Sequence, residues 1–123
     1  RAVLDGMGEG FGLLDRDFTI LDVNAEAQRL DGRAREAITG RSHWEVHPGT
    51  EHSHIGDFYR RVLATGRPEE LEHSYRWPDG RETWLRLRAF PVPEGLALFY
   101  GDVSARRAAE AAARESAERV ALA

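Results

Sequence analysis

The chain has 123 residues, 41% of them hydrophobic, so it has the length of one domain and enough apolar side chains for a single core. A net charge of −4 argues against nucleic acid as the main partner, and no apolar run approaches the roughly 18 residues of a membrane span. Cysteine and lysine are both absent, and the 17 positions counted as lysine or arginine are all arginine. Disulfides, thiolate metal ligands, cysteine nucleophiles and Schiff-base lysines are therefore excluded.

The N-terminal residues 1–9 predict a short amphipathic helix, with Val3, Leu4 and Met7 on one side. Two glycines within this segment weaken the helix, because glycine has low helix propensity. The chain starts with Arg1 and not with methionine, so we expect it to be part of a longer protein.

A β-hairpin and a helix are expected next. Two short apolar runs, residues 11–14 and 19–23, predict the two strands of the hairpin, with a turn at residues 15–17. Asn24 stands where a helix N-cap is needed, since its side-chain oxygen can accept hydrogen bonds from the free amides of a first helical turn. Residues 25–31 then favour a helix, which ends at a glycine.

The middle of the chain contains one clear helix. Residues 35–39 predict one or two helical turns, and the segment that follows is irregular. From about Ser53, apolar residues recur with the spacing of one helix face, which predicts an amphipathic helix. The Gly-Arg-Pro sequence at residues 66–68 ends it.

Three strands are expected in the second half, separated by the turn sequences Pro-Asp-Gly and Pro-Glu-Gly. Apolar and polar residues alternate over 69–77 and 81–92, whereas 96–103 is almost wholly apolar and predicts a central strand covered on both faces. Two strands, several helices and three further strands in this order predict an α+β domain. We expect a five-stranded antiparallel sheet with the helices on one face.

The last strand runs almost directly into an alanine-rich helix over residues 105–123. Small residues recur in this helix with alternating spacings of four and three, which is typical of a coiled-coil seam. Because an isolated helix of this length is marginal, we expect it to pair with a second copy; the alternative is a single solvated helix. The seam would contain Ala109, Ala113, Ser116, Val120 and Ala123.

Five segments, in this order and spacing, resemble a PAS domain over residues 3–110. They are GFGLLDRDFTILDVNAEAQRLDG, REAITGRSHWEVHP, VLATGRPEE, WPDGRETWLRLRAFPV and GLALFYGDVSARRAAE. The resemblance implies the PAS fold, with a pocket between sheet and helices, a sensor domain over 1–104 and a signalling helix over 105–123. It also implies a relay of the signal into that helix through Asp102, Val103, Ser104, Arg106 and Arg107.

The alternation of the strands predicts which side chains face this pocket. His73 and Tyr75 are the polar members of an apolar set, so they are candidates to orient a small ligand. The alternative is that they are core residues, satisfied by each other or by the backbone. No carboxylate is expected in the pocket, so we expect no catalysis by this chain. The predicted pocket residues are Phe58, Tyr59, Val62, Leu71, His73, Tyr75, Leu85, Leu87, Leu98 and Tyr100.

The absence of cysteine and the positions of the histidines restrict which cofactors of the PAS family this chain could bind. Cysteine-dependent flavin and coumarate photochemistry is excluded. Haem would need an axial histidine on the helix from Ser53, but His54 is about one residue from the required place and would point elsewhere. His43 and His47 have helical spacing, yet a Pro-Gly pair follows and argues against a continuous helix, so no metal site is expected. We expect no cofactor, and the histidines leave pH sensing open.

The opposite face of the sheet carries aromatic and arginine side chains, which the cores of interfaces prefer. We expect the N-terminal segment and a second subunit to cover this face. The alternative is a solvated face with cross-strand ion pairs, such as Glu70 or Glu72 with Arg86 or Arg88. The predicted interface residues are Val3, Leu4, Met7, Trp84, Arg86 and Phe90.

Together these features predict the sensory domain of a larger bacterial signalling protein. The resemblance points to a cytoplasmic sensor histidine kinase of a two-component phosphorelay, which forms a homodimer and continues into an effector domain after Ala123. The state of the pocket would bias the sheet, and the paired exit helices would carry this bias to the effector. The alternatives are a ligand-free dimerisation module and the input domain of a diguanylate cyclase or a transcription regulator.

Overall fold

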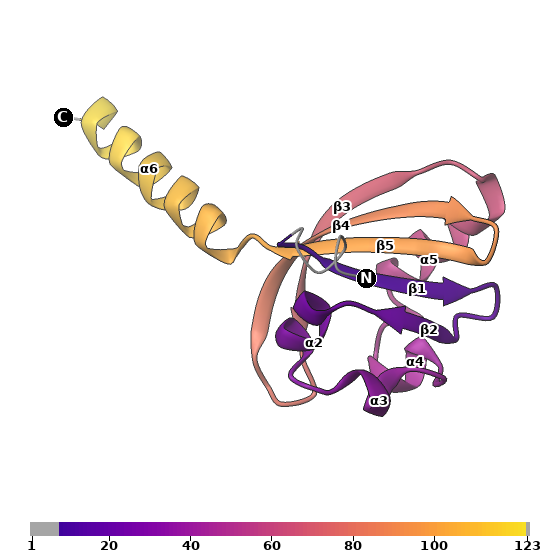
Figure 1. The fold of residues 1–123 in the computed structure, drawn as a ribbon. Helices are drawn as coiled ribbons and strands as arrows, with labels where there is room; N and C mark the ends of the chain where they lie inside the picture. The colour runs from indigo at the N-terminus through magenta and orange to yellow at the C-terminus, as the bar shows by residue number, and fades with distance from the viewer. Residues whose placement is uncertain (1–7, 123) are drawn as a thin grey trace.

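Residues 8–122, which the computed structural model describes, form a five-stranded antiparallel sheet with helices packed on one face (Figure 1). The strand order is β2-β1-β5-β4-β3. The strands are β1 (Gly10–Asp15), β2 (Ile20–Val23), β3 (Glu69–Arg76), β4 (Glu82–Val92) and β5 (Gly95–Asp102), and the helices are α2 (Ala25–Asp31), α3 (Arg35–Ile38), α4 (His43–Val46), α5 (His54–Thr65) and α6 (Ser104–Leu122). The predicted fold class is confirmed, whereas residues 1–7 of the expected N-terminal helix lie outside the described residues.

One side chain closes the β1–β2 hairpin, and a second ties the hairpin to the start of α2. The Asp15 carboxylate accepts hydrogen bonds from two backbone amides of the turn, both 2.9 Å away, and so closes the hairpin. Asn24 is 2% exposed, and its Oδ1 accepts from the amides of Phe11 and Ala27, both at 2.9 Å. Asn24 therefore caps α2, as its position predicted, and also fixes the start of β1.

The long helix α5 begins and ends as the sequence predicted. The Ser53 hydroxyl accepts from the Ile55 amide at 3.1 Å, and Gly66 ends the helix with a φ of 69°. The sequence did not predict the single turn of α4, which ends at Val46 and does not continue through His47. Four residues are too few to show a periodic pattern, and the cap comes from Ser42, whose hydroxyl accepts from the second amide of the turn.

The alternation predicted for β4 is confirmed. Every second residue from Thr83 to Ala89 is buried against the helices, whereas Arg86 between them is exposed on the other face. β4 pairs with β3 on one side and with β5 on the other, and β5 also pairs with β1. The apolar sequence of β5 thus corresponds to a central strand.

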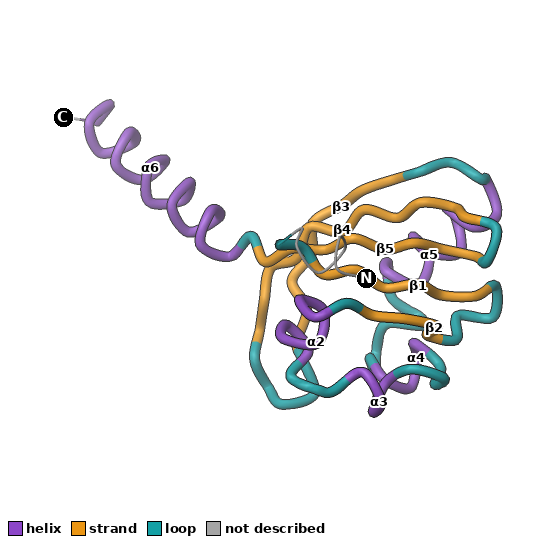
Figure 2. Tube along the Cα trace, in the orientation of Figure 1, coloured by secondary structure: helices purple, strands orange, loops and turns teal. Residues whose placement is uncertain are grey.

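The helix α6 leaves the domain directly after β5, and Val103 alone separates the two elements (Figure 2). The helix projects away from the sheet, and the predicted seam residues from Ala109 to Val120 are exposed on its surface. Ala123 lies outside the described residues, and the pairing of α6 with a second copy stays a prediction. In the part of the chain that the structure describes, no helix has both the length and the apolar character that a membrane crossing requires.

Candidate functional site

The sheet and the helices enclose a cavity of about 60 Å³. Its floor is the apolar inner face of the sheet, where Leu85, Leu87 and Leu98 lie. Its roof comes from the helices and from the loop after α4, which contributes Thr50. This volume holds a few water molecules or a small organic molecule, and it is far below the roughly 300 Å³ at the lower end of pockets for drug-sized ligands.

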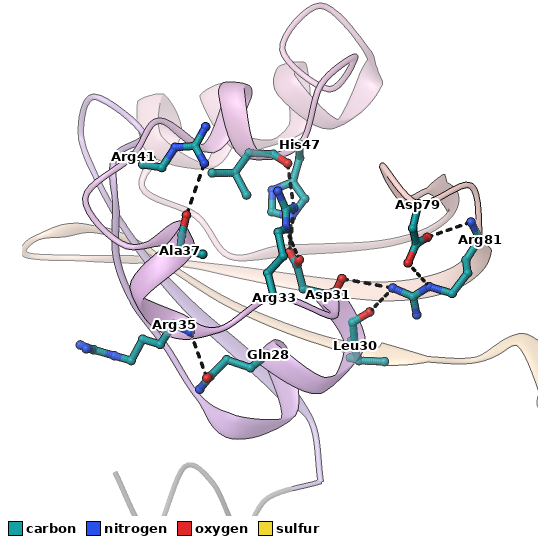
Figure 3. Close-up of polar contacts among 11 residues, drawn as sticks. Gln28, Leu30, Asp31, Arg33, Arg35, Ala37, Arg41, His47, Asp79 and Arg81 are labelled. Carbon is teal, nitrogen blue, oxygen red and sulfur yellow. Dashed lines mark hydrogen bonds and ion pairs between the residues drawn. The ribbon is translucent and has the colours of Figure 1, made fainter.

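One end of the cavity is polar, because Asp31 and His47 meet there. Since a carboxylate only accepts, His47 Nε2 donates to Asp31 Oδ2, at 3.1 Å. Arg33 donates to the same carboxylate and, at 2.9 Å, to the Val46 carbonyl (Figure 3). Arg81, from the turn between β3 and β4, donates to the main-chain carbonyl of Asp31 at 3.1 Å (Figure 3). The buried carboxylate is thus compensated by two partners.

Burial and these partners set the ionisation of the polar end. Burial raises the pKa of Asp31, but the hydrogen bonds from His47 and Arg33 outweigh it, and the pKa lies below its ordinary value. The ring centroid of His43 lies 4.6 Å from that of His47, and burial, followed by the charge of His47, lowers the pKa of His43 well below its ordinary value. Burial also lowers the pKa of His73 to about 4. His43 and His73 are therefore neutral at pH 7.

Three tyrosines of the cavity wall keep their protons. Burial raises the pKa of Tyr75 to about 12, and it raises those of Tyr59 and Tyr100 as well. The ring of Tyr75 packs against those of His47 and Trp77, with centroid distances of 5.7 and 4.9 Å. The cavity therefore offers neutral hydrogen-bonding groups on an apolar background.

The connection between β5 and α6 is held against the same sheet. The Val103 amide donates to the Trp84 carbonyl at 2.8 Å, and the Trp84 amide donates to the Ser104 hydroxyl at 3.0 Å. Asp102 Oδ1 accepts from the Ser104 amide at 2.9 Å. The Arg107 guanidinium lies 3.6 Å from the centroid of the Trp84 ring. These contacts hold the strand-to-helix connection firmly against β4.

Glu72 of β3 holds the first turn of α6 from the side. Its carboxylate accepts hydrogen bonds from Arg106 at 2.7 Å and from Arg107 at 2.9 Å. The next residue, His73, lines the cavity on the other face of the strand. Consecutive residues of β3 therefore contact α6 and the cavity.

A family model described as PAS fold matches residues 4–108. The chain is a PAS domain. PAS domains are sensory modules, and the resemblance inferred from the five sequence segments is thereby confirmed. Among curated protein sequences, none matches the chain.

Solved structures of other PAS domains share the fold at low sequence identity. A PAS domain from Colwellia psychrerythraea is 17% identical with a TM-score of 0.72, covering 84% of this chain and 92% of that one. The PAS domain of a LuxR-family transcriptional regulator from Burkholderia thailandensis, solved with ethanol, is 21% identical with a TM-score of 0.67. The match covers 84% of this chain and 96% of that one. The photoactive yellow protein domain of a sensor histidine kinase from Rhodospirillum centenum is 21% identical with a TM-score of 0.73. The match covers 82% of this chain and 91% of that one.

The cavity of this PAS domain does not fit the large cofactors considered from the sequence. The ring systems of haem and flavin are too large for about 60 Å³. The exposed side chain of His54 lines a separate outer hollow, where its ring lies edge-on to that of His73 at a centroid distance of 5.7 Å. Among the described residues, no group of three or more His, Asp and Glu is placed to hold a metal ion.

Three of the ten predicted pocket residues do not line the cavity. On α5 the row that faces it contains Ile55 and Tyr59, whereas Phe58 and Val62 form the neighbouring row, which packs into the core. Leu71 is partly exposed and packs against the edge of that core. The cavity is lined, as expected, by Tyr59, His73, Tyr75, Leu85, Leu87, Leu98 and Tyr100.

The sequence interpretation missed the polar end of the cavity. The expectation that no carboxylate lies there is wrong, because Asp31 lines the cavity together with His43, His47 and Thr50. These residues come from the end of α2 and from the α4 region, which show no periodic pattern. One signal was available: a carboxylate in the last turn of a helix is unfavourable with the helix dipole, so Asp31 requires a cationic partner such as Arg33.

The outer face of the sheet finds partners within the chain. Arg86 pairs with Glu70 at 2.8 Å, as the alternative interpretation predicted, and Arg107 covers the ring of Trp84. Phe90 lies edge-on to a phenylalanine of β5, with 5.8 Å between the ring centroids. The remaining predicted interface residues, Val3, Leu4 and Met7, lie outside the described residues. The dimer interface stays a prediction.

Proposed function

We propose that this PAS domain is the sensory input of a larger signalling protein, in which the state of the cavity controls the position of α6. The observation that carries the proposal is the double role of β3 and β4. His73 and Leu85 line the cavity on the inner face, whereas their neighbours Glu72 and Trp84 hold α6.

A ligand in the cavity changes the position of α6 only if it binds two arrangements of the sheet with different affinity. A shift of β3 that accommodates a ligand at His73 also moves the Glu72 carboxylate, because the two residues are adjacent. The paired contacts of Arg106 and Arg107 would then tighten or break. Asp102, Val103 and Ser104 pass the change into the helix through their contacts to each other and to Trp84.

As the larger protein we propose a bacterial sensor histidine kinase in a two-component phosphorelay, cytoplasmic at this domain, with its effector after α6. The photoactive yellow protein domain from Rhodospirillum centenum, which belongs to a sensor histidine kinase, supports this context. A transcription regulator is the second candidate, supported by the LuxR-family relative. In either context we propose a homodimer, paired through the exposed small residues of α6 and through the outer face at Trp84, Arg86 and Phe90.

The test is the effector output of the full-length protein. Glu72→Gln removes the charge that holds Arg106 and Arg107, and Asp102→Ala removes the acceptor of the Ser104 amide. Both variants should change the basal output or the response to signal. Glu70→Gln is the matched control, because Glu70 lies on the same face of the same strand but pairs with Arg86 and not with α6.

Normal output and normal response in both Glu72→Gln and Asp102→Ala would contradict the relay. An equal change in Glu70→Gln would also contradict it, since a loss of surface charge in general, and not the contact to α6, would then be responsible.

A further inference from the structure

We infer that the cavity binds a small uncharged molecule that carries a hydroxyl or amide group, held between His47 and Tyr75. The inference rests on the proposed sensory role of the cavity and adds to it the chemistry of the ligand. Its basis is a pair of buried polar atoms: within residues 8–122, neither His47 Nδ1 nor the Tyr75 hydroxyl has a hydrogen-bond partner. Buried polar groups are normally paired, so two unpaired atoms at one cavity indicate a missing partner.

The first atom, His47 Nδ1, is an acceptor held in a fixed position. Because Nε2 donates to the Asp31 carboxylate at 3.1 Å, the second ring nitrogen, Nδ1, is left for a ligand, and it accepts when the ring is neutral. The backbone on either side is held as well: the His47 carbonyl accepts from the Thr50 hydroxyl at 2.6 Å, and the Val46 carbonyl accepts from Arg33 at 2.9 Å. The ring therefore has little freedom to turn toward another partner.

The second atom, the Tyr75 hydroxyl, offers a donor close by. Tyr75 is 9% exposed, and its ring packs edge-on against both His47 and Trp77. The centroids of the Tyr75 and His47 rings lie 5.7 Å apart, so one small molecule can reach both side chains. Burial raises the pKa of Tyr75 to about 12, and the phenol keeps its proton at neutral pH.

These two atoms and their surroundings define the chemistry of the ligand. A hydroxyl or a primary amide can donate to His47 Nδ1 and accept from the Tyr75 hydroxyl at once. A charged group is disfavoured, because Arg33 already pairs with the Asp31 carboxylate and burying an unpaired charge is costly. The leucines of the floor favour a short apolar chain on the ligand. Water satisfies both polar atoms but gains nothing from the apolar floor.

An outer hollow of about 200 Å³ adjoins the cavity. It lies between the start of α5 and β3, and it shares Thr50, Ile55, His73 and Tyr75 with the cavity wall. The Tyr75 side chain thus lies where the two spaces adjoin.

The test is a titration of the whole chain, followed by amide chemical shifts in NMR, with four probes of similar size. We expect 1-butanol and butyramide to shift amides of β3 and α4 in a saturable manner. Butyrate, which is anionic, and 1-chlorobutane, which lacks the donor, should bind at least about tenfold more weakly. Equal binding of butyrate or 1-chlorobutane would overturn the assigned chemistry, and an absence of saturable binding by any probe would leave water as the occupant and overturn the inference.

Variants then test the two side chains. Tyr75→Phe removes a single oxygen and should weaken 1-butanol binding about five- to tenfold, the effect of one lost hydrogen bond. Ser116→Ala is the control, because it also removes one hydroxyl but lies exposed on α6 outside the cavity, and it should leave the affinity unchanged. An equal loss in both variants would refute the role of Tyr75. The probe series on the unmodified chain does not depend on the folding of any variant, and the output test with Glu72→Gln uses no probe, so either proposal can fail without the other.

Discussion

Replacing Asp31 should reveal how much the polar end of the cavity contributes to stability. Asp31→Ala leaves Arg33 and His47 without their shared carboxylate, and breaking a buried ion pair costs about 3–5 kcal/mol. Because the Arg33 side chain is 30% exposed and regains water, we expect the lower end, about 3 kcal/mol. Asp31→Asn keeps one acceptor oxygen and should lose about half of this amount.

The measurement is the free energy of unfolding in urea at 25 °C, followed by circular dichroism.

The loss of stability in the Asp31 variants should also depend on pH. The pKa of Asp31 in the folded protein lies below its ordinary value, so the carboxylate stabilises the fold fully above the unfolded pKa of about 3.9, and this contribution disappears as the pH falls through the folded pKa. The difference between the wild type and Asp31→Asn should therefore shrink below about pH 4. A loss under 1 kcal/mol in Asp31→Ala at pH 7, or a difference that grows on acidification, would refute the reasoning. Glu118→Ala, which removes an exposed carboxylate on α6 away from the cavity, is the control and should leave the midpoint unchanged.

Two further changes test how the elements around the cavity are held. Asn24→Ala removes the acceptor shared by the Phe11 and Ala27 amides and should lower the free energy of unfolding by about 2–3 kcal/mol, whereas Ser53→Ala, which removes only the cap of α5, should cost about 1 kcal/mol. Equal losses in the same urea assay would contradict the additional role of Asn24 in β1. Gly56→Ala should unfold the domain or lower its melting temperature strongly despite the higher helix propensity of alanine, because the new Cβ would lie 2.0 Å from the Glu51 carbonyl oxygen. A normal melting temperature would show that this loop can move away from α5.

Local patterns in the sequence were sufficient for most elements of the fold. The alternation along β4, the cap at Asn24 and the glycine at the end of α5 each depend on residues within one or two turns of each other, so the sequence displays them directly. The alternation of side chains along β3 likewise predicted that His73 and Tyr75 face the cavity, and both residues line it.

The polar end of the cavity could not be predicted in the same way. His47 lies 16 residues from Asp31, and their contact depends on how the α4 region folds back over the end of α2. No periodic pattern encodes such a contact. The row of α5 that faces the cavity was misassigned because Phe58 and Val62 have the same spacing as Ile55 and Tyr59, and helical periodicity alone does not say which row meets a space and which meets the core.

The firm attachment of α6 at Trp84 makes the helix act as a lever. Its 19 residues span about 28 Å at 1.5 Å per residue. A tilt of about 10° at the Trp84 contact would therefore displace the far end by about 5 Å, close to one helical turn. The displacement of the far end is thus set by the length of α6 and by the contacts that Ser104, Arg106 and Arg107 make to β3 and β4, and Trp84 is one position at which it can be altered.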